Sequence, residues 1–242
     1  MHYNKFILIL IFFLTGCYQN ETVQKKDYIF GTIVEVTIYG ETNDKSSHAI
    51  GLVFNEFRRL HNYLHPWEKS IIQDINQSIK NAEIYTTEDE EIFSIIKHNQ
   101  ELELKTRGYF NPAIGKLIET WGFHADQFAT NRPNSNLIDK LQRNVPHMSD
   151  IEIHSGYIDS KNKNIQLDLG GYAKGYALEQ AKIILSENNI KNALINIGGN
   201  ILALGQHGDR NWVVGIQNPR EPGSIASIIL KPGWSIGTSG DY

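Results

Sequence analysis

The stretch QLDLGGYAKGYALEQA, residues 166–181, changes from a strand pattern to a helix pattern across a pair of glycines. Apolar and polar residues alternate up to Asp168, which is typical of a strand with one buried face. Gly170 and Gly171 allow backbone angles and close approaches that a side chain would block. We therefore predict a strand, a tight turn at the two glycines, and a helix that starts near Tyr172.

The glycine turn has two possible uses. The first N–H groups of a helix are unpaired and carry partial positive charge, so an anion could bind there beside Lys174. Asp168 would repel a bare phosphate, but it could orient a ribose hydroxyl or a ring N–H, or act through a metal ion. The alternative is a tight strand-to-helix corner in which Asp168 only caps the helix. Lone glycine pairs are weak signals, so this stretch by itself leaves both interpretations open.

Outward from this stretch, hydrophobic periodicity predicts further strands and helices. The expected strands are residues 31–39, 164–171, 191–205 (two strands around a glycine turn), 211–219 and 224–232. The expected helices are residues 46–64, 86–108, 115–123 and 176–189. In the second helix, Thr87 and Glu90 have the spacing of a capping box. Strands and helices do not alternate regularly, so we predict an α+β domain with mixed, largely antiparallel sheets and packed helices.

The composition is that of a globular protein with mixed surface charge. The chain has 242 residues, of which 40% are hydrophobic and 21% charged, and its net charge is −4. This length can form one large domain or two small ones. A nucleic-acid surface needs a basic patch, whereas acidic and basic residues are mixed along this chain. We therefore expect no nucleic-acid partner.

The first residues, MHYNKFILILIFFLTGCYQN, differ from the rest of the chain. The apolar run 6–14 is too short to cross a bilayer of about 30 Å and fits the core of a secretory signal. Leu-Thr-Gly-Cys resembles the bacterial lipobox, in which the cysteine, here Cys17, is lipidated. We predict a lipoprotein signal peptide at 1–16, a lipidated tether at 17–27 and a domain at 28–242. The expected location is the outer side of the bacterial cytoplasmic membrane or the periplasm-facing envelope. An ordinary signal peptide or a short buried segment is the alternative.

Two further glycine-rich windows could approach a ligand. Gly198 and Gly199 lie between Asn196 and Asn200, whose amides offer donors and acceptors. The alternative for this window is a plain hairpin turn. The window GWSIGTSGDY, residues 233–242, could bind phosphate or metal, or form a simple turn.

The window GYFNPAIGKLIETWGF, residues 108–123, is rich in aromatic side chains. This density suits a flat ligand and also suits a core. We expect Trp121 and Phe123 to belong to the core. No Gly-x-Ser-x-Gly elbow is present and the histidines are scattered, so we predict no nucleophilic triad and assign no catalytic residue.

Taken together and in this order, the windows resemble the ApbE family, flavin transferases that move FMN from FAD onto a threonine of a target protein. The similar motifs are FGTIVEVTIYG, HPWEKSIIQDIN, YFNPAIGKLIETWGF, LDLGGYAKGYALE, INIGGNI and TSGDY, which run from Phe30 to Tyr242. The resemblance implies an ApbE-like, T-fold-related domain with FAD as substrate and Mg²⁺ as cofactor. It also implies an acceptor protein, which we expect to be an exported subunit of a membrane redox complex.

The resemblance assigns roles to residues by position. It implies that the flavin site is lined by Phe30, Trp67, Tyr109, Phe110 and Asn111, that Asp168 and Lys174 contact FAD, and that the Gly171 carbonyl is a magnesium ligand. Magnesium would neutralise the diphosphate and stabilise charge as the bond to AMP breaks.

The family pattern continues past Ser-Gly-Asp-Tyr with a His-Ile-x-Asp-Pro segment and an Asp-Ala-x-x-Thr segment, which supplies side-chain ligands for magnesium. The sequence ends at Tyr242. We therefore expect weak magnesium binding, impaired transfer and exposed sheet edges in this chain. The alternative function is that of a non-catalytic FAD-binding lipoprotein.

Overall fold

The computed structural model describes residues 21–125 and 132–239 of the chain. In chain order the elements are β1 (Thr22–Ile29), β2 (Thr32–Tyr39), α1 (Asn43–Tyr63), α2 (Ile71–Asn81), β3 (Tyr85–Thr86), α3 (Glu90–Lys105), α4 (Gly115–Thr120), α5 (Ser135–Arg143), the 3₁₀ turn η1 (Met148–Asp150), β4 (Ile151–His154), β5 (Tyr157–Ser160), α6 (Gly170–Glu187), β6 (Ala193–Ile197), β7 (Asn200–Leu204), β8 (Trp212–Gln217), β9 (Ser224–Leu230) and β10 (Ser235–Ile236). None of the helices in the described ranges is both long and apolar enough to cross a membrane.

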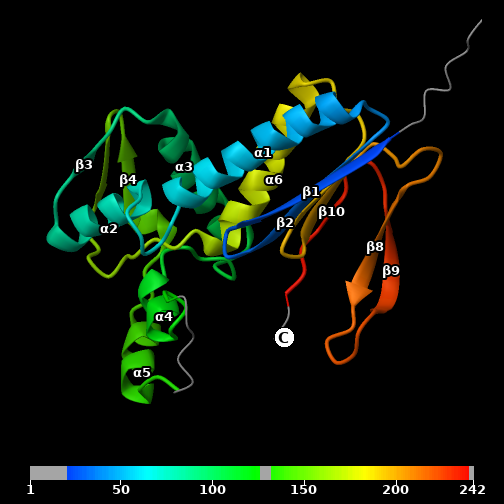
Figure 1. Ribbon diagram of the computed structural model, residues 1–242. Helices are drawn as coiled ribbons and strands as arrows, with labels where there is room; N and C mark the ends of the chain where they lie inside the picture. Colours follow the sequence, from blue (N-terminus) through cyan, green and yellow to red (C-terminus); the bar gives the residue numbers. More distant parts are fainter. Residues whose placement is uncertain (1–20, 126–131, 240–242) are drawn as a thin grey trace, which may run out of the picture.

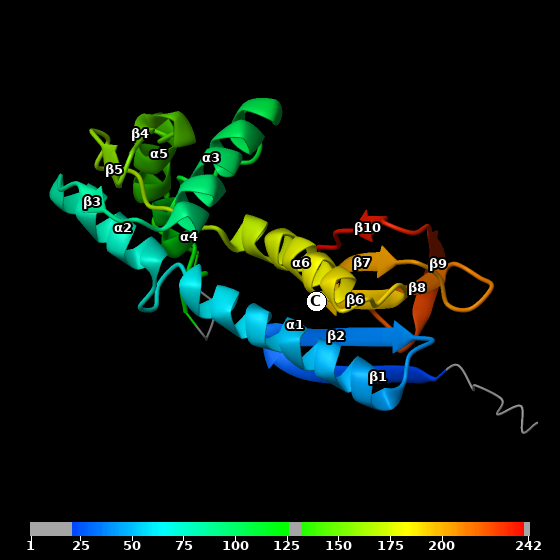
Figure 2. The same ribbon diagram turned by 90° about the horizontal axis from the view of Figure 1, so that it is seen from above.

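The main sheet has the strand order β1-β2-β6-β7-β10, and every neighbouring pair is antiparallel. Helices α1 and α6 lie side by side over one face of this sheet (Figures 1 and 2). A smaller antiparallel sheet, β3-β5-β4, lies beside α2 and α3, and β8 and β9 form a separate hairpin (Figure 1). The predicted α+β class with largely antiparallel sheets is confirmed.

The core forms where the predicted periodicities of β2 and α1 meet. Val34, Val36 and Ile38 alternate along β2 and are fully buried. The expected apolar face of the first helix is buried as well, and it consists of Ala49, Val53, Phe57, Leu60 and Leu64. Burying one such aliphatic side chain contributes about 1.5–3 kcal/mol. The contact between these two faces therefore holds α1 on the sheet.

The prediction of a tether up to residue 27 is wrong for residues 22–27, which belong to β1. This strand pairs with β2 along its whole length, from Thr22 opposite Tyr39 to Ile29 opposite Thr32. It is an edge strand, and only Val23 and Ile29 are buried in it. Edge strands carry polar side chains because one side faces solvent, so their composition resembles that of a linker. The predicted signal peptide and lipidation site, residues 1–16 and Cys17, lie outside the described residues.

The prediction of a strand at 164–171 is wrong, although its alternation is real. Ile165, Leu167 and Leu169 are buried as expected, but the only ladder contact is one parallel bridge between Ile114 and Gln166. The neighbouring segment adds only one further hydrogen bond, from the Asp168 N–H to the Pro112 carbonyl at 2.9 Å, because proline has no N–H to return and α4 begins at residue 115. The helix that follows starts at residue 170, two residues before the expected start. Gly170 and Gly171 are therefore its first two residues, and the predicted turn at these glycines is wrong.

Other predicted boundaries hold or shift slightly. The capping box at Thr87 is wrong: the N-cap of α3 is Asp89, whose side chain accepts the N–H groups of Glu91 and Ile92. The hairpin β6–β7 and the strands β8 and β9 are confirmed, and β8 and β9 pair with each other. In β9 every residue except Leu230 is exposed.

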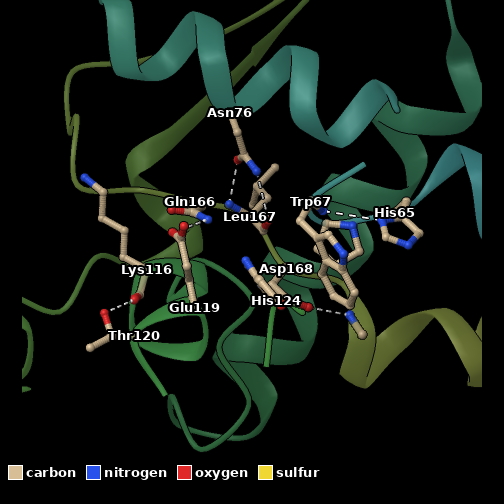
Figure 3. Close-up of polar contacts among 12 residues, drawn as sticks. His65, Trp67, Asn76, Lys116, Glu119, Thr120, His124, Gln166, Leu167 and Asp168 are labelled. Carbon is tan, nitrogen blue, oxygen red and sulfur yellow. Dashed lines mark hydrogen bonds and ion pairs between the residues drawn. The ribbon is translucent and has the colours of Figure 1, made fainter. Parts of the chain in front are cut away.

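A single buried amide ties the segment before α6 to α2. The Asn76 side chain donates to the Leu167 carbonyl at 3.0 Å and accepts the Leu167 N–H at 2.6 Å (Figure 3). Asn76 is 7% exposed and Leu167 is fully buried. Both backbone groups of Leu167 are therefore paired by one side chain, which replaces the missing strand ladder at this point.

We expect Asn76→Ala to lower the free energy of unfolding by about 3 kcal/mol, because it leaves a buried N–H and a buried C=O unpaired. Urea denaturation followed by circular dichroism measures this loss. Gln77→Ala is the matched control, since Gln77 is exposed on the same helix and pairs only with Asn81. A loss below about 1 kcal/mol for Asn76→Ala would show that the amide is not needed.

Tyrosines join α1, α3 and α6 through hydrogen bonds. Tyr63 donates to Asp89 at 2.7 Å, and Tyr176 donates to Glu91 at 3.0 Å. Burial first, and then these hydrogen bonds, raise the pKa of both hydroxyls above the ordinary range. Burial raises the pKa of Tyr172 to about 12. The folded state therefore holds protons that the unfolded chain releases near pH 10.

The sign of the pH dependence follows from these raised pKa values. Stability from the tyrosines is fully present below about pH 10 and is lost as the pH rises toward about 12, because the unfolded chain ionises first. Urea midpoints measured across this range should fall. Tyr176→Phe should flatten the fall, whereas Tyr109→Phe, at a side chain that is 95% exposed, should leave it unchanged. Equal slopes in all three proteins would contradict the assignment.

Candidate functional site

A cavity of about 600 Å³ opens between the β1–β2 turn, the end of α1 and the start of α6. Five residues singled out from the sequence line it, namely Phe30, Trp67, Asp168, Gly171 and Lys174. A cavity of about 670 Å³ beside α3 contains none of these residues. The 600 Å³ cavity, called the main cavity below, is therefore the candidate site.

One wall of the main cavity begins at the turn between β1 and β2. Phe30 and Gly31 have φ angles of 57° and 68°, as a two-residue type I′ hairpin turn requires. A bulky residue is unusual in this left-handed region. The Phe30 ring packs edge-on against His61 at 5.7 Å and lies 6.0 Å from Phe57. These contacts hold the ring at the cavity wall.

The wall continues as a row of rings. Centroid distances are 5.1 Å from His61 to His65, 4.6 Å from His65 to Trp67, and 5.0 Å from Trp67 to His124, where the rings stack at 26°. His65 is buried, and its Nδ1 accepts the Glu68 N–H at 2.9 Å. The expectation of scattered histidines is wrong for His61 and His65, because they are four residues apart at the end of α1.

A buried carboxylate lies next to this row. Asp168 is 7% exposed; its Oδ1 accepts the Gly170 N–H at 2.8 Å, and its Oδ2 lies 2.8 Å from Nε2 of His124 (Figure 3). Asp168 thus pairs one N–H at the start of α6, although the N-cap residue itself is Leu169. The same carboxylate also lines the main cavity, so the two interpretations of the glycine turn do not exclude each other.

The start of α6 supplies positive charge to the same cavity. Gly170, Gly171, Ala173 and Lys174 all line it. The first turn of a helix carries partial positive charge, and the lysine adds a full one. A bound molecule therefore meets an aromatic wall, a cationic helix end and a carboxylate that accepts N–H or O–H groups.

The donor set of the described residues does not make a complete magnesium site. Gly171, the residue whose carbonyl the resemblance assigns to the metal, is the second residue of α6. Both oxygens of Asp168 already have protein partners. Within residues 21–125 and 132–239, no three His, Cys, Asp or Glu side chains are grouped so that they could hold a metal ion. The Gly171 carbonyl thus has no carboxylate cluster beside it.

The segment from Tyr109 to Asn111 does not line the main cavity. Tyr109 is 95% exposed, and Phe110 packs against the hydrophobic core. Asn111 donates to the Pro146 carbonyl at 2.8 Å and accepts the Ala113 N–H at 2.9 Å. The structure places these three residues beside the site, where they shape the turn before α4. Their assignment to the flavin stays a prediction.

The expectation that Trp121 and Phe123 belong to the core is wrong, since they are 45% and 54% exposed. They follow α4, a helix of only six residues that projects with α5 away from the sheets (Figure 1). Phe123 contributes to the main cavity, and the next residue, His124, reaches Asp168. Sequence reasoning missed His124 because no spacing pattern connects it to Asp168.

The glycine window between β6 and β7 forms the plain hairpin turn. Asn196 accepts the Gly199 N–H at 2.9 Å, and Gly198 and Gly199 have φ angles of 53° and 89°. Neither glycine lines the main cavity. Residues 240–242, which complete the window at the chain end, lie outside the described residues.

Known proteins resemble this chain over most of its length. The sequence model of the ApbE family matches residues 30–242. A protein of Rhodobacter capsulatus named FAD:protein FMN transferase is 33% identical over 91% of the chain, and the chain spans 42% of that protein. A protein of Buchnera aphidicola with the same name is 28% identical, and the chain covers 72% of its length.

Solved structures share the fold. The crystal structure of the ApbE protein from Thermotoga maritima matches with a TM-score of 0.81 and 27% sequence identity. The matched region covers 92% of this chain and 71% of the Thermotoga chain. The apo form of the flavinyl transferase ApbE from Pseudomonas stutzeri matches with a TM-score of 0.78 and 19% sequence identity. The matched region covers 94% of this chain and 71% of the Pseudomonas chain. Because the family model matches far more than half of the sequence, the chain belongs to the ApbE family.

Proposed function

We propose that this chain transfers FMN from FAD to a threonine hydroxyl of a second protein and releases AMP. The observation that carries the proposal is that Phe30, Trp67, Asp168 and Lys174 line one cavity. Its volume of about 600 Å³ lies within the usual range for small-molecule sites. The name of the Rhodobacter capsulatus relative supports the same activity.

Each part of the main cavity suits one part of FAD. The aromatic wall at Phe30 and Trp67 suits a flat ring, because offset stacking buries apolar area. The start of α6 and Lys174 suit the diphosphate, which carries negative charge. Asp168 repels phosphate but accepts ring N–H or sugar O–H groups. The diphosphate is therefore expected nearer to Lys174 than to Asp168.

The proposed reaction is a phosphoryl transfer. The threonine oxygen bonds to the phosphorus of the FMN half, the P–O bond to AMP breaks, and the hydroxyl proton is released to solvent. Magnesium, when bound, supplies positive charge against the diphosphate. The Gly171 carbonyl is the one ligand that we propose from these residues. We derive no step through the metal, because the described residues do not complete its ligand set.

Binding of FAD without transfer is the second candidate function. The observation that favours it is the missing group of three ligating side chains within the described residues. A hard cation such as Mg²⁺ binds weakly without anionic oxygen ligands. The main cavity itself serves both candidates equally well.

The proposed setting is the bacterial cell envelope. Lipidation of Cys17 would hold the domain on the outer side of the cytoplasmic membrane or in the periplasm-facing envelope. The acceptor that we propose there is an exported subunit of a membrane redox complex. The net charge of −4 agrees with a protein partner and with no nucleic acid.

The full chain, purified in detergent, should bind FAD and should add FMN to a threonine-bearing acceptor domain in the presence of Mg²⁺. Fluorescence titration measures the binding, and mass spectrometry of the acceptor measures the transfer. We expect Lys174→Ala to weaken FAD binding about tenfold, because a hydrogen bond to a charged group contributes about 1.5–3 kcal/mol. Lys182→Ala is the matched control on the same helix, since Lys182 pairs with Glu179 outside the cavity.

The outcomes separate the candidates. Binding of FAD with an FMN adduct on the acceptor supports the transferase. Tight binding without any adduct leaves FAD binding as the function. A folded chain that does not bind FAD would contradict both candidates.

A further inference from the structure

His124 forms a buried pair with Asp168. Their side chains are 5% and 6% exposed, and Nε2 of His124 lies 2.8 Å from Oδ2 of Asp168 (Figure 3). An ionised carboxylate can only accept hydrogen bonds, so the histidine Nε2 carries the hydrogen in this pair. A buried charge is costly without a partner, and His124 supplies one to Asp168.

The pair leaves Asp168 with defined free acceptor sites. Oδ1 takes the Gly170 N–H, and Oδ2 takes the His124 N–H. Each carboxylate oxygen has about two lone-pair positions, so one remains on each oxygen. The two fixed hydrogen bonds determine the rotation of the carboxylate. The remaining lone pairs can accept N–H or O–H groups of a molecule in the main cavity.

The same histidine also fixes the aromatic wall. Its ring stacks on Trp67 with a centroid distance of 5.0 Å and an angle of 26°. His124 does not itself line the main cavity; it lines an adjoining cavity of about 240 Å³ that shares Trp67 with it. His124 can therefore act on a molecule in the main cavity only through Asp168 and Trp67.

We propose that His124 is a positioning residue for ligand recognition. It orients the Asp168 carboxylate and the Trp67 ring so that they receive the hydrogen-donating edge of a nucleoside or flavin ring. The inference rests on the proposed flavin function and deepens it. It adds that the His124–Asp168 hydrogen bond, and not the ring stacking alone, sets the affinity.

Two substitutions of His124 separate the hydrogen bond from the ring. His124→Phe keeps a ring against Trp67 and removes the donor, and we expect FAD to bind at least about tenfold more weakly. His124→Gln keeps an N–H donor without the ring, and we expect affinity within about threefold of the unaltered chain. His98→Phe is the matched control, because His98 bonds to Tyr172 and does not line the main cavity.

A double-mutant cycle gives the second readout. If His124 acts through Asp168, His124→Phe in an Asp168→Asn background should weaken FAD binding by less than about twofold further. If His124 had only a structural role, His124→Phe would weaken FAD binding equally in the unaltered chain and in the Asp168→Asn background. Nitrogen NMR of the full chain without FAD should also place the ring hydrogen of His124 on Nε2, with the signal assigned by its loss in His124→Phe.

The result expected is selective loss in His124→Phe, rescue in His124→Gln and no further loss in the double variant. The inference would be overturned if all variants bound FAD equally well, or if His124→Phe and His124→Gln lost the same affinity. It would also be overturned if the ring hydrogen of His124 were only on Nδ1. Failure of the unaltered, folded chain to bind FAD would instead overturn the proposed function, while the NMR measurement still tests the pairing.

Discussion

The two hydrogen bonds between Asn76 and Leu167 are the constraint on which the candidate site depends. They hold the segment before α6 against α2 by pairing the N–H and the C=O of one buried residue. The next residue along the chain is Asp168, whose carboxylate lines the main cavity. A displacement of this segment would move the carboxylate and the first turn of α6 together. The Asn76 amide, together with the hydrogen bond from the Asp168 N–H to the Pro112 carbonyl, thus sets the position of both charged parts of the site.

Positive and negative groups share one short segment of this site without cancelling each other. Asp168 lies just before the helix, where the partial positive charge of the first turn and the Gly170 N–H stabilise a carboxylate. Lys174 lies one turn further along and faces the same cavity. Because the two charges lie at different places on the cavity wall, a molecule with one anionic part and one hydrogen-donating part can satisfy both. A simple phosphate could pair with Lys174 but not with Asp168.

The aromatic wall shows how distant segments combine into one surface. Phe30 comes from a hairpin turn, His61 from the end of α1, Trp67 from the following loop, and His124 from the segment after α4. His65 lies between His61 and Trp67 and contacts both, and His124 stacks on Trp67 from outside the main cavity. The row of rings is therefore continuous although its members are far apart in the sequence. The unusual left-handed backbone at Phe30 is tolerated because the ring gains these contacts and the hairpin needs this geometry.

The sequence by itself determined the local periodicities: the buried faces of β2 and α1, the hairpin β6–β7, the strands β8 and β9, and a helix that follows Asp168. These follow from the spacing of apolar residues and from turn chemistry, which act over a few residues. The motif series also pointed to Phe30, Trp67, Asp168, Gly171 and Lys174, which the fold brings to one cavity. Only the tertiary structure decided that residues 22–27 are an edge strand, that Leu167 pairs with the Asn76 side chain instead of with a neighbouring strand, and that His124 meets Asp168. Such pairings join segments far apart along the chain, and their energies come from burial and hydrogen bonds that exist only after packing.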